Sequence, residues 1–292
     1  TAVKNIQMAQ VPVLLLGGAT ATILKGRGSL QDIDQMALLR PLTKHQVIIK
    51  RGKDIANEIN KAIIIAQSGV PGPVFVELPL DLLYPQNLVR ELYGLNTDDQ
   101  KRSWWMEKYL QRSLNRIFAS FETAPSPIPE ITCPMPVSSA MQKASKMMYN
   151  AKSPVLLIGS QTMLNVTQVD NLVQKLASLD IPMFVSGMAR GLLSKEELNI
   201  FRHQRKKALQ EADLVLLAGI PCDFRLGYGR QINRKAEIIS INRSRSDLYL
   251  NRKPTLAIQA DPASFFSSLP KNQLENMVYS DAWIDTLRQR DK

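Results

Sequence analysis

The chain has 292 residues, of which 45% are hydrophobic, 6% aromatic and 22% charged, and its net charge is +11. This composition is typical of folded globular domains and excludes a disordered chain, and no apolar run approaches the roughly 20 residues that a membrane-spanning helix needs. The two cysteines form no CxxC pair and only two histidines are present, which excludes an ordinary structural zinc site.

Residues 1–84 alternate short apolar runs with helical patterns, which predicts a parallel sheet built from βαβ units. A helical pattern over 1–9 opens the chain. The predicted strands cover 11–18, 46–50 and 73–78, and a helix is predicted over 54–68. Three strands are too few for a complete doubly wound domain, so we expect this part to be about half of one.

The pattern loosens over residues 85–136, where a single amphipathic stretch at 104–121 is followed by a series of prolines. These prolines are Pro125, Pro127, Pro129, Pro134 and Pro136. Because proline-spaced segments favour extended backbone, the segment 85–136 is predicted to be a linker that carries one amphipathic helix.

A second α/β series fills residues 137–270. Its predicted strands cover 154–158, 181–185, 214–218, 237–241 and 255–259, and its predicted helices cover 138–149, 166–179, 205–211 and 263–269. Strands and helices in this number predict a complete Rossmann-like domain with a parallel sheet. Residues 271–292 are expected to begin a further linker.

The positive charge is spread along the chain, which argues against a nucleic-acid partner. The densest cluster, 202–207, contains no aromatic residue and precedes an apolar strand. It is interpreted as the solvated face of a helix.

In doubly wound sheets, ligands bind beyond the carboxyl ends of the strands, where this chain repeatedly places small or polar residues. These residues are Gly159, Ser160, Gly187, Met188, Gly219, Asn242 and Asp261. Two interpretations stay open: the glycines bring backbone close to an adenine nucleotide, or they serve the turns between strands and helices, which favour glycine in any case. No GxGxxG or GxxxxGK[ST] motif decides between them.

Other polar residues do not form a recognisable catalytic or metal-binding set. No GxSxG motif is present, and neither histidine has an evident serine or cysteine partner. His45 is predicted to be structural, and Asp32 and Asp34 are predicted to be carboxylates at a helix N-terminus. No metal site is predicted in this chain.

Five runs in the first domain stand in a specific order and spacing, at 1–5, 12–19, 28–34, 40–44 and 68–79. They resemble the second half of the pyrimidine-binding domain in thiamine diphosphate-dependent enzymes of the acetolactate synthase type. The runs 208–219, 239–242 and 258–261 are similar to the central domain of the same family. Two more runs, 187–193 and 222–230, are similar to its 2-hydroxyacyl-CoA lyase branch.

The resemblance implies that the whole protein is a lyase dependent on thiamine diphosphate and Mg²⁺, cleaving 2-hydroxy fatty acyl-CoA to formyl-CoA and a shortened aldehyde. In the family, the glutamate that activates the cofactor lies upstream of the part that matches Thr1. The GDG motif that holds magnesium and diphosphate belongs to a third domain, expected after Lys292. The chain is therefore expected to be an interior fragment that is inactive alone.

The resemblance also bears on individual residues. Gln31 matches a family position that lines the active site, although an exposed glutamine at a helix start is the alternative. Leu80 stands where acetolactate synthases carry a lysine, which argues against acetolactate formation. Asn242 replaces a common aspartate that would take a ribose hydroxyl, so ADP or FAD in the central domain stays an open alternative.

Two other functions remain as alternatives: an acetolactate synthase-type transferase that condenses 2-oxo acids, and a non-catalytic nucleotide-binding or assembly module. The resemblance implies a homodimer or homotetramer. It also implies residence in the endoplasmic reticulum membrane through a segment N-terminal to this chain, with cytoplasmic or mitochondrial residence as the alternative.

Overall fold

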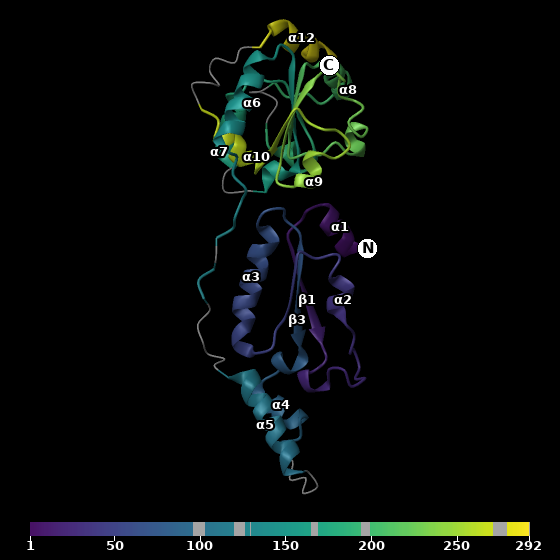
Figure 1. Ribbon diagram of the computed structural model, residues 1–292, viewed down its shortest axis with the longest axis vertical. Helices are drawn as coiled ribbons and strands as arrows, with labels where there is room; N and C mark the ends of the chain where they lie inside the picture. Colours follow the sequence, from purple (N-terminus) through teal and green to yellow (C-terminus); the bar gives the residue numbers. More distant parts are fainter. Residues whose placement is uncertain are drawn as a thin grey trace. The chain divides into compact units, whose positions relative to one another are not determined.

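The computed structural model describes residues 1–95, 103–119, 126–128, 130–164, 169–193, 199–270 and 279–291. Two compact α/β units divide the chain, Thr1–Thr132 and Cys133–Lys292 (Figure 1). The boundary falls near the C-terminal end of the segment that was predicted to be a linker. None of the helices in the described ranges is long and apolar enough to cross a membrane.

The first unit is built on a three-stranded parallel sheet in the order β1-β3-β2. Its strands are β1 (Val13–Ala19), β2 (His45–Ile48) and β3 (Pro73–Pro79). Its helices are α1 (Ala2–Met8), α2 (Gln35–Leu39), α3 (Ile55–Gln67), α4 (Gln86–Leu92) and α5 (Trp104–Phe118), with 3₁₀ turns η1 (Thr22–Leu24), η2 (Gly52–Asp54) and η3 (Leu80–Leu82). Every residue of β3 is buried because this strand lies between the two others.

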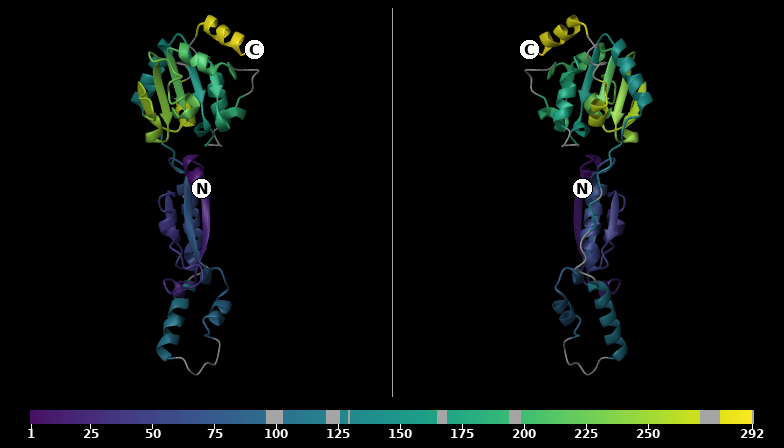
Figure 2. Two further views of the ribbon diagram at one scale, coloured as in Figure 1. Left: turned by 90° about the vertical axis from the view of Figure 1, so that its right-hand side faces the viewer. Right: turned by 90° about the vertical axis from the view of Figure 1, so that its left-hand side faces the viewer.

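The helix predicted over 104–121 is α5, which belongs to the first unit. Its C-terminal end is anchored, since Ile117 packs in the same cluster as Ala62 of α3 and Val76 of β3. Leu110 and Leu114 pack against Val89 and Tyr93, so α5 lies along α4 (Figure 2). Part of the predicted linker is therefore packed secondary structure.

Asp81 ties three elements of the first unit together at the end of β3. This carboxylate is 2% exposed and accepts hydrogen bonds from the backbone N–H of Thr22 (3.0 Å), the Thr22 hydroxyl and the Tyr93 hydroxyl (2.7 Å). Burial and then the hydrogen bond to Asp81 raise the pKa of Tyr93, which therefore stays a donor. The contacts connect η1, η3 and α4.

The second unit contains a five-stranded sheet in the order β5-β4-β6-β7-β8, with all neighbours parallel. Its strands are β4 (Pro154–Ile158), β5 (Met183–Val185), β6 (Leu214–Ala218), β7 (Glu237–Asn242) and β8 (Leu256–Gln259). Its helices are α6 (Ser138–Asn150), α7 (Val169–Ala177), α8 (Arg205–Glu211), α9 (Arg245–Leu248), α10 (Pro262–Ser267) and α12 (Asp281–Arg290), with 3₁₀ turns η4 (Ser160–Met163), η6 (Gly187–Gly191) and η7 (Phe224–Leu226). The predicted α/β class with parallel sheets is confirmed.

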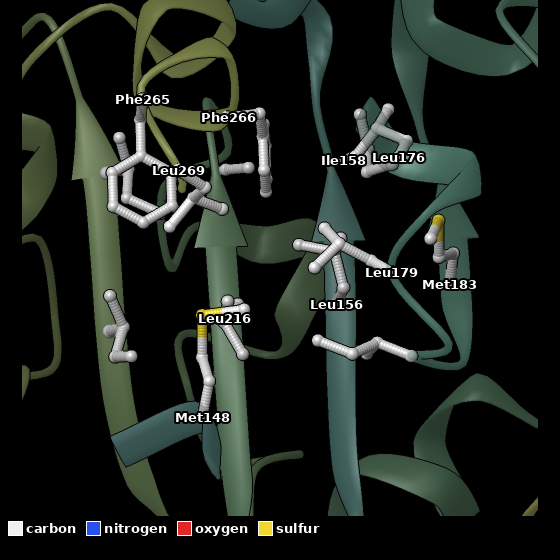
Figure 3. Packing of buried hydrophobic residues seen from close by; sticks show 14 of the residues in the cluster. Met148, Leu156, Ile158, Leu176, Leu179, Met183, Leu216, Phe265, Phe266 and Leu269 are labelled. Carbon is white, nitrogen blue, oxygen red and sulfur yellow. The ribbon is translucent and has the colours of Figure 1, made fainter. Parts of the chain in front are cut away.

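Alternation along the strands creates a separate core on each face of this sheet. Leu156 and Ile158 of β4 point into a cluster with residues of α6, α7 and α10, shown in Figure 3. Val155 and Leu157 of the same strand point into a second cluster, formed with α8 and α12. Helix α12 thus packs into the core through Trp283, Ile284 and Leu287.

Two predicted boundaries differ from the structure in informative ways. The strand predicted over 181–185 is shortened to β5, because Pro182 has no N–H and joins the ladder only through its carbonyl, which accepts from Leu156 (2.9 Å). In the range 271–292, which was predicted to begin a linker, residues 279–291 contain α12, whereas 271–278 lie outside the described residues.

We expect Tyr93→Phe to lower the free energy of unfolding by about 1–3 kcal/mol, because the substitution removes a donor to a buried carboxylate. Urea denaturation followed by circular dichroism measures this change. The matched control is Tyr84→Phe, since Tyr84 is 43% exposed. Equal effects of the two substitutions would show that the Tyr93–Asp81 hydrogen bond contributes no net stability.

We also expect the two cysteines to differ in reactivity. Cys222 is 4% exposed and burial raises its pKa to about 11, whereas Cys133 is partly exposed. Because the thiolate is the reactive form, and only about one part in a thousand of Cys222 is thiolate at pH 8, Cys222 should react slowly, at a rate that rises about tenfold per pH unit. Iodoacetamide labelling between pH 7 and 9 with peptide mass spectrometry measures both rates, and in denaturant the two should converge. Equal labelling in the folded chain at pH 8 would contradict this.

Candidate functional site at the carboxyl edge of the second sheet

The second sheet has a topological switch point next to β4. The chain passes from β4 to β5 on one side and then returns to the other side to form β6. Ligands of doubly wound folds bind in the crevice outside such a point. Here the crevice is bordered by the residues that follow β4 and β6, which include Gly159 and Gly219.

Three glycines at this edge permit the loops to pack closely against one another. A Cβ atom on Gly159 would lie 2.3 Å from the carbonyl oxygen of Gly219, and one on Gly219 would lie 2.7 Å from the Cβ of Gln161. Gly187 has φ +59°, and a Cβ there would lie 2.2 Å from the Ser160 hydroxyl. Contacts between the loops alone therefore account for glycine at these positions.

Gln161 fills the space between β4, β6 and β7 and is 5% exposed. Its Nε2 donates to the Oδ1 of Asn242 (2.9 Å), and its Oε1 accepts from the backbone N–H of Arg243 (3.0 Å). The Oδ1 of Asn242 also accepts from the N–H of Ser244 (2.8 Å). The Nδ2 of Asn242 has no hydrogen-bond partner among the described residues, so one buried donor is left at the end of β7.

Both carboxylate oxygens of Asp261 already accept hydrogen bonds from other residues of the chain. Its Oδ2 accepts from the Nε of Arg243 (2.7 Å) and pairs with its Nη2 (2.6 Å), and both side chains are almost completely buried. The Oδ1 accepts from the backbone N–H and the hydroxyl of Ser264 and so caps α10. A buried carboxylate with these partners has little capacity left for a ribose.

The seven residues predicted at the strand ends therefore lie on one edge of the sheet, in two groups. Gly159, Ser160, Gly187, Met188 and Gly219 surround the ends of β4, β5 and β6. Asn242 ends β7 and Asp261 follows β8, and Gln161 joins the two groups. The N–H of Met188 donates to Ser160 (3.2 Å), and its side chain is 63% exposed. Their role in nucleotide binding stays a prediction.

A cavity of about 690 Å³ lies beside this edge, against α8. Four cationic side chains line it, those of Arg190, Arg202, Arg205 and Lys206, together with Phe184 and Phe201. None of its described lining residues is acidic. We call this cavity the cationic pocket.

Sequence reasoning missed the cationic pocket, because it interpreted the cluster 202–207 as the solvated face of a helix. The available signal is the density of cationic residues over 202–207, since Arg205 and Lys206 begin α8 and Arg202 lies three positions before the helix. Arg190 comes from η6, more than ten positions earlier in the chain. Only the fold brings that residue to the same cavity.

The candidate residue of the first unit, Gln31, is exposed and has φ +64°. It precedes α2 in a loop that Asp32 closes by accepting from the N–H of Gly26 (2.7 Å). Asp34 caps α2 by accepting from the N–H of Ala37 (2.9 Å), which confirms the predicted carboxylate at a helix start. Asp32 does not cap a helix, and its carboxylate stabilises the loop by accepting from backbone N–H groups.

Two further positions discussed from the sequence also lie in the first unit. His45 begins β2, and burial followed by the charge of Lys61 lowers its pKa, so it is neutral at pH 7. Leu80 begins η3 and is 37% exposed. Within the described ranges, no group of three or more histidine, cysteine, aspartate or glutamate residues could hold a metal ion.

Comparison with known proteins shows similarity to one family of enzymes. The model of the thiamine pyrophosphate enzyme central domain matches residues 141–269. The 2-hydroxyacyl-CoA lyase 2 of Danio rerio is 45% identical, and that of Homo sapiens is 40% identical; each alignment covers 100% of this chain, and 48% and 47% of those proteins, respectively. A probable acetolactate synthase of Mycobacterium bovis is 25% identical over 83% of this chain and 39% of its own length.

The chain thus spans about half the length of the curated relatives it matches. The matched central domain coincides with the five-stranded sheet and its helices, from α6 through α10. The similarity to 2-hydroxyacyl-CoA lyase 2 extends through the first unit as well. Residues 141–269 thus match the central domain of thiamine pyrophosphate enzymes, and the whole chain is similar to 2-hydroxyacyl-CoA lyase 2.

Proposed function

We propose that the whole protein is a thiamine diphosphate- and Mg²⁺-dependent lyase that cleaves 2-hydroxy fatty acyl-CoA. The observation that carries this proposal is the similarity of the entire chain, at 40–45% identity, to proteins named 2-hydroxyacyl-CoA lyase 2. Similarity to an acetolactate synthase is weaker and covers less of the chain. Leu80, in place of the family's lysine, favours the lyase further.

The proposed reaction breaks the bond between C1 and C2 of the substrate. The hydroxyl-bearing C2 becomes the carbonyl of an aldehyde one carbon shorter, and C1 leaves as formyl-CoA after it gains the proton that the hydroxyl loses. When bound, thiamine diphosphate supplies the stabilisation of the carbanion that this cleavage requires. No oxidant or reductant is consumed.

On this proposal, Gln31 is a residue of this chain that contacts the cofactor or the substrate. Gln31 would reach the cofactor or the substrate with an amide that both donates and accepts hydrogen bonds. No described group of side chains fits Mg²⁺. Because the chain spans about half the length of the relatives on which this proposal rests, we propose that the chain alone is inactive.

Several further properties belong to this proposal. Family members of this type would form homodimers or homotetramers. ADP or FAD is a candidate ligand of the central domain, where the buried Nδ2 of Asn242 is a donor at the strand ends without a partner among the described residues. We also propose residence in the endoplasmic reticulum membrane.

The full-length protein, incubated with thiamine diphosphate, Mg²⁺ and a 2-hydroxy long-chain acyl-CoA, is expected to release formyl-CoA and an aldehyde one carbon shorter, both identified by mass spectrometry. A parallel reaction contains pyruvate. Acetolactate as the product would support the transferase instead. Absence of any product in both reactions would favour a non-catalytic module.

We expect Gln31→Asn in the full-length protein to lower kcat/KM for the acyl-CoA about tenfold, the size of one lost hydrogen bond. Asparagine tolerates the positive φ at this position, so the loop should be preserved. Since the side chain is exposed, the free energy of unfolding should stay within about 0.5 kcal/mol of the wild type. The matched control, Gln86→Asn at the exposed start of α4, should leave both quantities unchanged. Unchanged kcat/KM for Gln31→Asn would remove this residue from the active site.

A further inference from the structure

The charge of the cationic pocket is not neutralised by the side chains around it. Among the described residues, no ion pair involves Arg190, Arg202 or Lys206. Burial and then the charges of Arg190 and Arg225 lower the pKa of Arg205, so like charges lie close together. Cations gathered in a cavity whose described lining includes no acidic residue create a positive potential that attracts anions.

The pocket is held in place by the fold. Phe184 and Phe201 are both 4% exposed, and their ring centroids lie 5.9 Å apart, which forms a rigid apolar wall. Asp291 accepts hydrogen bonds from the backbone N–H groups of Arg202 and His203, each at 2.6 Å. The Nη2 of Arg205 donates to the carbonyl of Arg225 (2.7 Å), which fixes the direction of this guanidinium.

The pocket is separate from the strand-end residues predicted to bind a nucleotide. It shares no lining residue with that set. Phe184 and Phe201 belong to the core on the α8 face, whereas Ala263 and Phe265, which follow Asp261, belong to the core on the opposite face. At the strand ends, Arg243 forms an ion pair with Asp261. Of these two places, the pocket is therefore the one whose cationic side chains form no ion pair among the described residues.

The size and charge of the cavity favour a ligand with several phosphates. A volume of about 690 Å³ is in the range of sites for small organic ligands and exceeds the space that one phosphate needs. Four cations match the roughly four negative charges of a diphosphate plus a phosphomonoester. A flat base can lie against the aromatic wall.

We infer that the cationic pocket binds the 3′-phosphorylated ADP portion of the acyl-CoA substrate. This inference rests on the proposed function, and it assigns Arg190, Arg202, Arg205 and Lys206 to substrate binding. The shared chemistry is an adenine nucleotide with a diphosphate, which free ADP also has. The 3′-phosphate, present in CoA and absent from ADP, distinguishes the two sources.

The test measures binding to the 292-residue chain by isothermal titration calorimetry with CoA, 3′-dephospho-CoA and ADP at low ionic strength. CoA should bind at least about tenfold more tightly than either of the others, since one charge-assisted contact corresponds to that factor. The affinity should fall as salt is added, because salt screens these charges. Equal affinities for CoA and ADP would assign the pocket to a free nucleotide and overturn the inference.

The double substitution Arg190→Gln, Lys206→Gln removes two cations that have no ion pair among the described residues. It should weaken CoA binding at least about tenfold. Lys207→Gln is the matched control, because Lys207 is exposed on the same helix and does not line the pocket. Circular dichroism verifies that each variant is folded. Loss of affinity only in the double variant supports the inference, and equal affinities of both variants contradict it.

The binding test and the activity test can fail independently of each other. If the chain does not bind CoA while the full-length protein produces formyl-CoA, the proposed CoA site is wrong and the proposed lyase activity is supported. If the chain binds CoA through the pocket and the full-length protein yields no product from a 2-hydroxyacyl-CoA, the proposed CoA site is supported and the proposed lyase activity is wrong.

Discussion

The second unit depends on a sheet that is covered on both faces. Strands β4 and β6 are buried along their whole length, and alternate side chains enter two different cores. Neither of these two strands carries a polar side chain, because an unpaired polar group in the core is costly. Polar residues near β4 and β6 are therefore restricted to the ends of the strands, where the chain turns.

Two kinds of polar arrangement follow from this restriction. Beyond β7 and β8, Gln161, Asn242, Arg243 and Asp261 bond to one another and close the edge. Beside β5 and α8, the cationic side chains face a cavity and have no acidic partners among its described lining residues. The first arrangement stabilises the fold, whereas the second has charge available for a ligand.

The first unit follows the same logic with a smaller sheet. β3 lies between β1 and β2 and is buried throughout, so the first polar groups after it, around Asp81, must be satisfied locally. They connect α4 to the sheet, and α5 packs in turn on α4. The segment 85–136, predicted to be a linker with one amphipathic helix, thus begins with two helices that belong to the unit.

The sequence by itself determined the α/β class and located the parallel strands to within about two residues, because the periodicity of apolar residues records which positions face a core. It did not predict the helices α4, α9 and α12. It did indicate the similarity to the family, through the order and spacing of motifs such as residues 28–34 and 68–79. Asp34 at the start of α2 followed from the local rules of helix capping.

Only the tertiary structure decided which polar residues are occupied and which are free. Asp261 is a plausible ligand contact in the sequence, yet it is buried and paired with Arg243, and this pairing depends on the register of β7 and β8. Arg190 and Arg205 are distant in the sequence but line one cavity, because the crossover from β5 to β6 brings η6 next to α8. Local patterns cannot contain such pairings, since they arise from how separate elements pack against a common sheet.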